Sequence, residues 1–243
     1  YTITSSSDGT KLAAVVQGGN IWTSWDSGET WTSRADPQNN WRDITSSSDG
    51  TKLAITVANK NIWTSTDSGE TWTEVKFTES THNTDGLTSS SDGTKLAVTV
   101  VGGNIWTSTD SGETWTSRAS TQPGWRGITM SSDGTELAAT VSGGNIWTST
   151  DSGETWTEVK PTESTQSYNR ITSSSGGTKL AVTVWNGNIW LYRTPICDEN
   201  WHVSNGACVP CGPGASRPQG DPIDGGDTEC ACVKDYYVLN GAC

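Results

Sequence analysis

The sequence predicts an all-β protein that is built from five copies of one four-stranded sheet and ends in a small cysteine-rich module. The pair Ile-Trp occurs five times, and its tryptophans lie 41, 43, 41 and 43 residues apart, at Trp22, Trp63, Trp106, Trp147 and Trp190. A fixed interval of about forty residues is the length of one four-stranded propeller blade. No segment shows the apolar stripe of an amphipathic helix. The predicted fold is therefore a five-bladed β-propeller over residues 1–193.

Each repeat contains four short β-prone runs that are separated by turn signals. In the second repeat they are Ile44–Gly50, Lys52–Val57, Asn61–Ser65 and Thr71–Thr73. The turn signals are Asp-Gly, Gly-Gly-Asn (here Ala-Asn-Lys-Asn) and Asp-Ser-Gly-Glu. The Ser/Thr-rich run suits an innermost strand at a crowded, wet axis. The Leu-Ala-Val run suits a middle strand that is covered on both faces, and the Thr-Trp run suits the outermost strand.

The motif Ser-x-Asp-Ser-Gly-Glu-Thr-Trp joins the last two runs at residues 24–31, 65–72, 108–115 and 149–156. It resembles the Asp-box, or BNR repeat, of sialidase-like propellers. The resemblance implies hairpins on the outer rim, away from any active centre. The Asp accepts backbone N–H groups, the Gly takes a positive φ and the Trp packs the turn onto the sheet. The structural residues are Asp26, Gly28, Trp31, Asp67, Gly69, Trp72, Asp110, Gly112, Trp115, Asp151, Gly153 and Trp156.

The fifth repeat departs from this pattern. Gly176 replaces the Asp of the first turn, and Leu191-Tyr192-Arg193 follows Trp190 with no Asp-box and no Thr-Trp run. The first residues cannot supply the missing outer strand, because Tyr1–Thr4 already aligns with the innermost strand of repeat 1. We therefore expect an open sheet edge, which recruits strands from the following segment or from a neighbouring molecule.

Composition narrows the classes of partner. The formal net charge of −12 argues against binding to nucleic acid or to anionic membranes, which both require basic patches. No apolar run approaches the roughly 18 residues of a membrane-spanning helix. Fourteen tryptophans carry most of the large apolar surface. Because the chain begins at Tyr1 without a signal-like segment, we expect a processed or partial product.

All six cysteines lie in the last 47 residues, within residues 194–243, which predicts a disulfide framework and an oxidising, secreted setting. Residues 197–208 are echoed at 232–243, and the module resembles cysteine-rich repeats of protist surface proteins and, more loosely, EGF-like or TNF-receptor-like modules. The pairing of the six stays open. A zinc site at the Cys-x-x-Cys and Cys-x-Cys spacings is the rival interpretation, and neither it nor a calcium site in the acidic loop at 221–227 is favoured. The cysteines are Cys197, Cys208, Cys211, Cys230, Cys232 and Cys243.

An enzyme would need unique catalytic groups. The sialidase resemblance implies an arginine cluster, a tyrosine nucleophile with a partner glutamate, and an acidic proton donor. Arg42 and Arg126 occupy one equivalent position before the innermost strand, Arg170 is shifted by one residue, and Tyr168 lies close by. The four Asp-box glutamates repeat and so are structural, whereas paired catalytic carboxylates should be unique. We therefore predict no catalytic residue, no metal and no cofactor.

A carbohydrate-binding function would rest on aromatic residues that break the repeat. Trp25 and Trp185 stand where other repeats carry smaller side chains, and Trp41 and Trp125 precede the innermost strand in repeats 2 and 4 only. Flat aromatic rings suit sugar stacking or a protein contact. Plugging of the channel mouth is the alternative role for Trp41 and Trp125. The candidate ligand or partner contacts are Trp25, Trp41, Trp125, Trp185, Arg42 and Arg126.

The function that we expect from the sequence is a non-catalytic, extracellular structural or adhesive subunit. An unfinished sheet edge and a cysteine-rich tail would let copies join head to tail in a filament or surface coat. The partner would be a second copy or another extracellular protein. Glycans are the partner under the lectin alternative, and any glycan carried by the chain would be O-linked because no Asn-x-Ser/Thr sequon occurs.

Overall fold

The computed structural model describes residues 2–34, 39–59, 61–76, 83–119, 124–160 and 166–193, and the backbone of four short strands beyond them. The chain divides into two compact units, Tyr1–Tyr192 and Arg193–Cys243. Strands and turns, but no helix, occur in the described residues. Among those residues, accordingly, no helix is long and apolar enough to cross a membrane.

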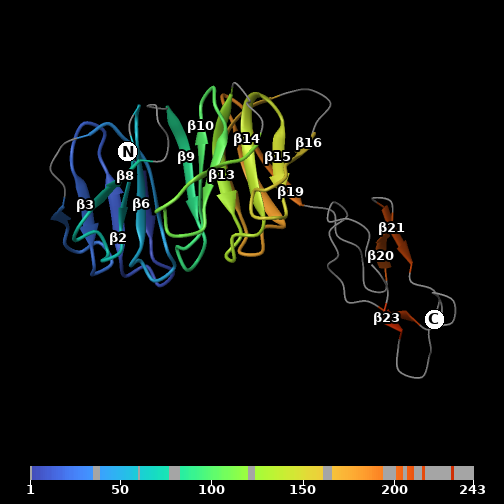
Figure 1. Ribbon diagram of the computed structural model, residues 1–243, viewed down its shortest axis with the longest axis horizontal. Coiled ribbons are helices and arrows are strands. Elements are labelled where there is room, and N and C mark those ends of the chain that lie inside the picture. The colour runs from blue at the N-terminus through green and yellow to red at the C-terminus, as the bar shows by residue number, and fades with distance from the viewer. Residues whose placement is uncertain are drawn as a thin grey trace. The chain divides into compact units, whose positions relative to one another are not determined.

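The first unit consists of antiparallel sheets that follow the repeats in order (Figure 1). Repeat 1 contains β1 (Thr2–Ser5), β2 (Leu12–Val15), β3 (Ile21–Ser24) and β4 (Thr32–Ser33). Repeat 2 contains β5 (Trp41–Ser46), β6 (Leu53–Val57), β7 (Ile62–Ser65) and β8 (Thr73–Val75). Repeat 3 contains β9 (Thr84–Ser89), β10 (Leu96–Val100), β11 (Ile105–Ser108) and β12 (Thr116–Ser117).

Repeat 4 contains β13 (Trp125–Met130), β14 (Leu137–Gly144), β15 (Ile146–Ser149) and β16 (Thr157–Val159). Repeat 5 contains β17 (Gln166–Ser173), β18 (Lys179–Val184) and β19 (Ile189–Arg193), with no fourth strand among the described residues. The ends of β14 and β17 pair through Ser142 and Ser167, so repeats 4 and 5 share one seven-stranded sheet. The predicted all-β architecture of four-stranded, blade-like sheets is confirmed.

Two details differ from the sequence expectation. β5 begins at Trp41, three residues before Ile44, because Trp41 pairs with Val57. β8 begins at Thr73 and not at Thr71, because the Thr71 N–H donates to the Asp67 carboxylate in the preceding turn. Hydrogen bonding within the turn therefore shortens the start of the outer strand.

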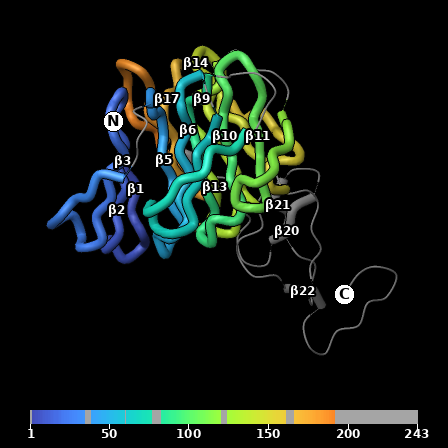
Figure 2. Tube along the Cα trace, turned by 60° about the vertical axis from the view of Figure 1, so that its left-hand side comes forward, coloured from blue at the N-terminus to red at the C-terminus, as the bar shows by residue number. Residues whose placement is uncertain are grey.

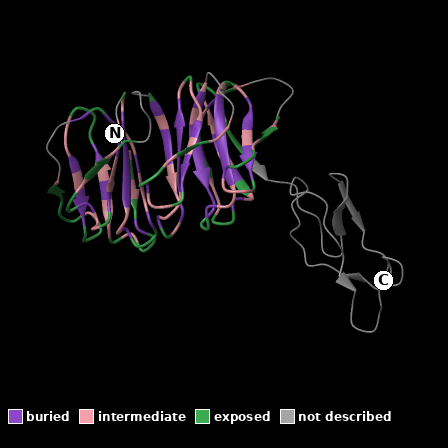
Figure 3. Cartoon of the chain, in the orientation of Figure 1, coloured by how far each residue is buried: buried purple, intermediate pink, exposed green. Residues whose placement is uncertain are grey.

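The core lies between the repeats, and each pair of neighbours makes one cluster. Every residue of β6 and β10 is buried, as predicted for a middle strand (Figure 3). Each of four clusters joins an Ala and an Ile from one repeat to apolar side chains of the next repeat. Ala54 and Ile62 of repeat 2, for example, pack with Leu87 and Val98 of repeat 3. We call these surfaces the trailing face of the earlier repeat and the leading face of the later one.

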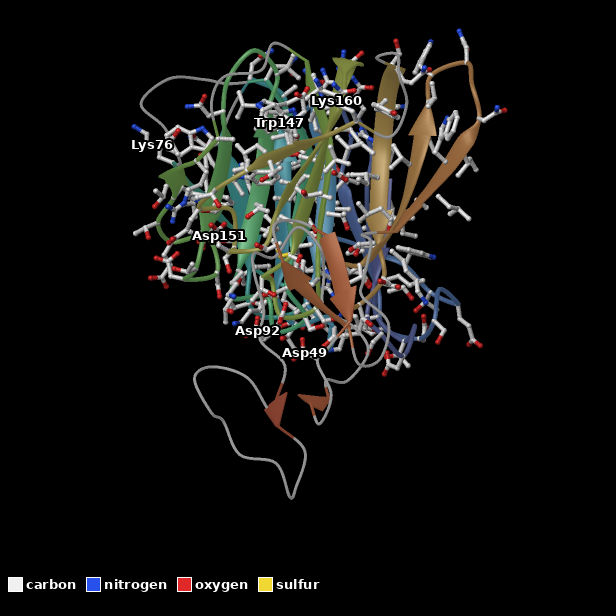
Figure 4. The ribbon with its side chains drawn as sticks, turned by 90° about the vertical axis from the view of Figure 1, so that its right-hand side faces the viewer. Asp49, Lys76, Asp92, Trp147, Asp151 and Lys160 are labelled. Atoms are coloured by element: carbon white, nitrogen blue, oxygen red, sulfur yellow. The ribbon has the colours of Figure 1, made fainter. Side chains whose placement is uncertain are left out.

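The innermost strands of consecutive repeats run side by side (Figure 2). Backbone N–H groups donate to carbonyl oxygens of the next repeat at 2.7 Å, from Ser7 to Ser48, Ser48 to Ser91, Ser91 to Ser132 and Ser132 to Ser175. Serines of all five repeats surround a hollow of about 270 Å³. The Ser/Thr-rich runs therefore do form the innermost, polar strands. We call the turn between the first and second strands of each repeat its first turn. Asp49 and Asp92 belong to two of these first turns and lie at one end of the sheets, and Lys160 lies at the opposite end (Figure 4).

The second unit contains two short antiparallel pairs. β20 (Trp201–Ser204) pairs with β21 (Ala207–Pro210), and β22 (Ala215–Ser216) pairs with β23 (Ala231–Cys232). The backbones of Cys208 and Cys232 lie in β21 and β23. The side chains of all six cysteines, from Cys197 to Cys243, lie outside the described residues, so the disulfide framework stays a prediction.

Candidate functional site

The four Asp-box hairpins have the same geometry. In repeat 1, Asp26 accepts hydrogen bonds from Ser24 Oγ at 2.7 Å and from the Thr30 N–H at 2.9 Å. Hydrogen bonds, first that of the Thr30 hydroxyl, lower the pKa of Asp26 to about 2. The indole of Trp31 donates to the Gly28 carbonyl at 3.1 Å and closes the turn. Asp67, Asp110 and Asp151 repeat these bonds, so the geometry of the carboxylates matches a turn-holding role.

Two residues of each Asp-box turn, and not the glycine alone, take a positive φ. Ser27 has φ 60° and Gly28 has φ 90°, and the same pair recurs in the other three boxes. The serine tolerates this conformation because the surrounding hydrogen bonds fix the turn. Its hydroxyl contacts the preceding repeat, as Ser68 does when it accepts a hydrogen bond from Lys11 Nζ at 3.1 Å.

Trp41 and Trp125 are fully buried and present no ring face to a ligand. Trp41 donates to the Gly19 carbonyl at 2.9 Å and meets Trp63 edge-on, with ring centroids 6.0 Å apart. Trp125 packs edge-on against Trp147 at 6.1 Å. Both tryptophans belong to the core clusters between neighbouring repeats.

Trp25 lies half-exposed on the outer side of repeat 1. Arg34 lies over its ring at 4.8 Å, and its indole N–H donates to the Ser68 carbonyl at 3.4 Å. With Arg34, Asp26 and neighbouring threonines, Trp25 lines a shallow hollow of about 160 Å³. The indole thus links repeats 1 and 2 and leaves part of one face open to solvent.

The structure brings Arg126 and Trp185 together. They line a groove of about 370 Å³ with Ser142, Ser167, Tyr168 and Asn169, between repeats 4 and 5. Trp185 is 68% exposed. The Tyr168 ring is buried, and its hydroxyl has no hydrogen-bond partner within the described part of the protein. A cation and an exposed aromatic ring therefore meet in one recess, above the buried ring of Tyr168.

Two aspartates, Asp85 and Asp43, offset part of the positive charge of Arg126 and Arg170. Asp85 lies between two guanidinium groups, with Oδ2 3.6 Å from Arg126 Nη1 and Oδ1 3.5 Å from Arg170 Nη2. Asp43 accepts the Leu87 N–H at 3.0 Å. Burial raises the pKa of Asp43, and the charge of Arg170 and the hydrogen bonds partly oppose this shift.

Sequence reasoning missed Asp43. The residue stands one position before Ile44, where repeats 3 and 4 carry Gly86 and Gly127, and that difference was the available signal. Arg42 is half-buried, and its Nε lies buried without a hydrogen bond. No ion pair links Arg42 to the Asp85 cluster in the described part of the chain. Nor do the described residues group three side chains that could bind a metal ion.

Known proteins resemble this chain in structure alone. No family of known proteins and no curated protein matches its sequence. An ancestral GH74 enzyme superposes with a TM-score of 0.61 at 13% identity, over 79% of this chain and 29% of that one. YCF48 from Cyanidioschyzon merolae superposes with a TM-score of 0.59 at 16% identity, over 76% of this chain and 64% of that one.

A structure described as YCF48 bound to D1 peptide superposes with a TM-score of 0.56 at 16% identity, over 88% of this chain and 76% of that one. The chain thus spans less than a third of the GH74 enzyme and about two thirds of YCF48 from Cyanidioschyzon merolae. At these identities the likeness concerns the fold only. This chain has a β-propeller-like fold that matches the BNR-type repeat sheets of GH74 enzymes and YCF48.

Proposed function

We propose that this chain is a non-catalytic extracellular structural or adhesive subunit. Five blade-like repeats form its rigid body, and the tail is a disulfide-stapled module. The subunit assembles with its partners into a filament or surface coat. Secretion is inferred from the clustered cysteines, which suit an oxidising compartment.

One observation carries this proposal: the two ends of the repeat array leave apolar side chains in solvent. Ile3 is 60% exposed, whereas its equivalents in repeats 2–5 are 5–9% exposed. At the other end Ile189 is 71% exposed, whereas its equivalents in repeats 1–4 are at most 1% exposed. Each uncovered side chain of this size forgoes roughly 1.5–3 kcal/mol of burial. Val16 is also exposed at the first end and Leu191 at the other, so each end presents more than one apolar side chain to a partner.

The fold by itself leaves the choice between catalysis and assembly open. The solved structures that it resembles include GH74 enzymes and a peptide-bound YCF48. The residues favour assembly, because the Asp-box carboxylates are engaged in turn hydrogen bonds and Tyr168 is buried. We therefore favour adhesion or assembly over catalysis as the function.

The test is the assembly state of the purified full-length protein. We expect sedimentation velocity to show species larger than one chain that grow with protein concentration, and electron microscopy to show ordered polymers. Monodisperse single chains at the highest soluble concentration would contradict the proposal. Hydrolysis of a glycoside by the wild type that is lost in the Arg126→Ala variant would also contradict the proposal, because it would show that the protein is a catalyst.

The groove between repeats 4 and 5 favours a second candidate, carbohydrate binding. Trp185 offers a flat apolar ring, and Arg126 offers a charged donor to hydroxyl or carboxylate oxygens. An acidic sugar fits this combination. Under this alternative Trp185→Ala and Arg126→Ala each weaken glycan-array binding about tenfold or more, the loss of one stacking or charge-assisted contact, whereas Thr157→Ala, an exposed outer-strand control, does not. Equal binding by all three variants would remove the groove as the site.

A further inference from the structure

We propose that the leading face of repeat 1 binds the trailing face of repeat 5 in a second copy of this chain, through the same contact that joins consecutive repeats. The leading face of repeat 1 comprises Ile3, Asp8, Gly9, Leu12, Val16 and Ser27. The trailing face of repeat 5 comprises Ser175, Lys179, Ala181, Ile189 and Leu191. The inference rests on the proposed self-assembly and specifies its interface, which uses sheet faces and not the cysteine-rich tail.

The four internal core clusters show what a complete contact contains. Each combines an Ala and an Ile of a trailing face with the leading-face residues of the next repeat. A fifth set exists in the sequence but is divided between the two ends. Ala181 and Ile189 are its trailing half, and Ile3, Leu12 and Val16 are its leading half. Ile3 and Ile189 are the most exposed members of their equivalent sets.

The first turn of repeat 1 is exposed where the first turns of later repeats are covered by their neighbour. In repeats 2, 3 and 4 the turn glycine lies against the lysine of the preceding repeat, as a Cβ on Gly50 would lie 2.9 Å from Lys11 Cβ. Gly9, the equivalent residue of repeat 1, has no atom within 4 Å of such a Cβ. The space that a preceding lysine fills elsewhere is therefore empty at repeat 1.

Lysine-to-serine bonds give the contact its polar part. Lys11 donates to Ser68 at 3.1 Å, Lys52 to Ser111 at 3.2 Å, and Lys95 to Ser152 at 3.2 Å, each time into the Asp-box turn of the following repeat. Repeat 5 has no Asp-box, and repeat 4 carries Glu136 in place of this lysine. The lysine is therefore replaced where its receiving turn is missing.

Repeat 5 nevertheless retains the lysine as Lys179, which is exposed, and repeat 1 retains the receiving turn with Ser27. Repeat 4 carries Glu136 in place of the lysine. The first turn of repeat 5, which lies against it, carries Gly176 in place of the aspartate. Lys179 is thus equivalent to the lysines, and Asp8 to the aspartates, that face each other across the internal contacts. In the part of the chain that the structure describes, neither Lys179 nor Asp8 takes part in an internal contact of this kind.

The internal contacts show that such a pair interacts. Hydrogen bonds, first that of the serine hydroxyl in the same turn, lower the pKa values of the first-turn aspartates, and the charge of the lysine in the preceding repeat adds to this shift. The aspartates are Asp49, Asp92 and Asp133, and the lysines are Lys11, Lys52 and Lys95. A copy that placed its Lys179 against Asp8 of the next copy would restore the same attraction.

The backbone supplies the direction of the contact. In each internal contact the serine N–H of the earlier repeat donates to the carbonyl of the later repeat. Two groups of this series stay unpaired among the described residues: the N–H of Ser175 and the carbonyl of Ser7. They do not bond to each other in this structure, so the chain does not close its own ring. A donor at one end and an acceptor at the other specify head-to-tail stacking of copies.

Repeat 5 has no fourth strand among the described residues, and the contact that we propose does not require one. The contact between repeats 1 and 2 joins the second and third strands of the earlier repeat to the first two strands and the Asp-box of the later repeat. The contact between repeats 3 and 4 adds an Arg118–Glu154 ion pair at 3.9 Å, for which repeat 5 has no equivalent arginine. Repeat 5 acts here as the earlier repeat, and repeat 1 supplies a complete Asp-box. Because the two faces differ, the contact is heterologous and can propagate.

The experiment mixes two variants that are each blocked on one face. Ile3→Asp blocks the leading face and Leu191→Asp blocks the trailing face, and both side chains are already exposed, so thermal melting should match wild type. Each variant alone should sediment as a single chain. An equimolar mixture should form dimers and nothing larger, because one intact face remains on each variant. Thr116→Asp, on an exposed outer strand, should assemble like wild type.

Three outcomes separate this inference from the proposed function. Wild type that assembles while both blocked variants also assemble overturns the interface and leaves self-assembly standing, through the tail or another surface. Wild type that never assembles overturns both. Single-chain behaviour of the mixture, with wild type assembled, shows that each variant is blocked for another reason and also overturns the head-to-tail contact.

A charge exchange tests the polar pair independently. Lys179→Glu should weaken self-association about tenfold or more, because the introduced carboxylate would face Asp8 of the next copy and replace an attraction with a repulsion. The double variant Lys179→Glu/Asp8→Lys should recover most of that loss, since each copy then presents the reversed pair. Failure of the double variant to recover, with the single variant impaired, would exclude the Lys179–Asp8 pairing.

Discussion

The Asp67 carboxylate accepts the backbone N–H of Thr71 at 2.9 Å and so bridges the two strands of the Asp-box hairpin in repeat 2. Ser65 Oγ donates to the same carboxylate at 2.8 Å and also accepts the Gly69 N–H at 2.9 Å. One carboxylate and one hydroxyl thus satisfy most of the polar groups of the turn. The same bonds recur in all four Asp-box hairpins.

Replacing this carboxylate should loosen the hairpin. Asp67→Ala leaves the Thr71 N–H and the Ser65 hydroxyl without their acceptor, and we expect a loss of about 1 kcal/mol of unfolding free energy, as for loss of a capping side chain. Chemical denaturation measures it. Glu70→Ala is the matched control, because Glu70 is exposed in the same turn. A loss in Glu70→Ala equal to that in Asp67→Ala would contradict the role of the carboxylate.

Acid should destabilise the protein in a narrow range. Hydrogen bonds lower the pKa of Asp26, Asp49, Asp92 and Asp133 to about 2, from an ordinary value of 3.8. A carboxyl with a lowered folded-state pKa stabilises the fold above about pH 4, and this contribution is lost as pH falls from about 4 to about 2. We expect the melting temperature to fall across that interval. A melting temperature that is constant down to about pH 2 would refute the assignment.

Asp43 should have a weak opposite effect on the pH dependence of stability. Burial raises its pKa, so its contribution to the free energy of unfolding is lost as pH rises through the raised pKa. An Asp43→Asn variant should therefore lose less stability between about pH 4 and about pH 7 than wild type does. Paired thermal melts at the two pH values give the comparison. An equal change in both proteins would show that Asp43 does not titrate in this interval.

Gly86 should tolerate no side chain. A Cβ there would lie 2.7 Å from the Arg126 carbonyl and 2.9 Å from the Ile128 N, both in the backbone of the next repeat. We expect Gly86→Ala to cost about 1–3 kcal/mol through overpacking. Gly176→Ala is the matched control, because nothing lies within 4 Å of a Cβ at Gly176. Equal stability of the two variants by chemical denaturation would contradict the packing between repeats 3 and 4.

Trp41 and Trp185 should differ sharply in their contribution to stability. Trp41 is fully buried between repeats 1 and 2, and Trp41→Ala should cost about 3–5 kcal/mol. Trp185 is exposed, and Trp185→Ala should leave the free energy of unfolding within about 0.5 kcal/mol of wild type. Chemical denaturation of both variants measures the difference. A large loss in Trp185→Ala would mean that the ring is structural and not available to a ligand.

The sequence determined the strands and turns of repeats 1–4 because the forces that form them are local. Asp-Gly, Asn and Asp-Ser-Gly-Glu signals specify turns through hydrogen bonds between residues close in the chain, as between Asp49 and Thr51. The interval of 41 or 43 residues then specified a stack of like sheets. The small, polar character of the serine runs sufficed to place them innermost, around the hollow that they line.

Only the tertiary structure decided which unusual residues are available. Trp41, Trp125 and Trp185 all break the repeat, yet two of them are buried by the neighbouring sheet and one is exposed. Asp85 meets arginines from two other repeats, an arrangement that depends on how the sheets stack and that no local pattern encodes.

The sequence predicted an open sheet edge at repeat 5, but it did not predict the exposure of Ile3 and Ile189, because both residues match their buried equivalents. Burial depends on which sheet lies next, and a repeated sequence specifies each face without specifying whether a neighbour covers it. The sequence by itself determined the repeating sheet and its turns, and the stacking of the sheets decided which of the equivalent side chains are buried and which are exposed.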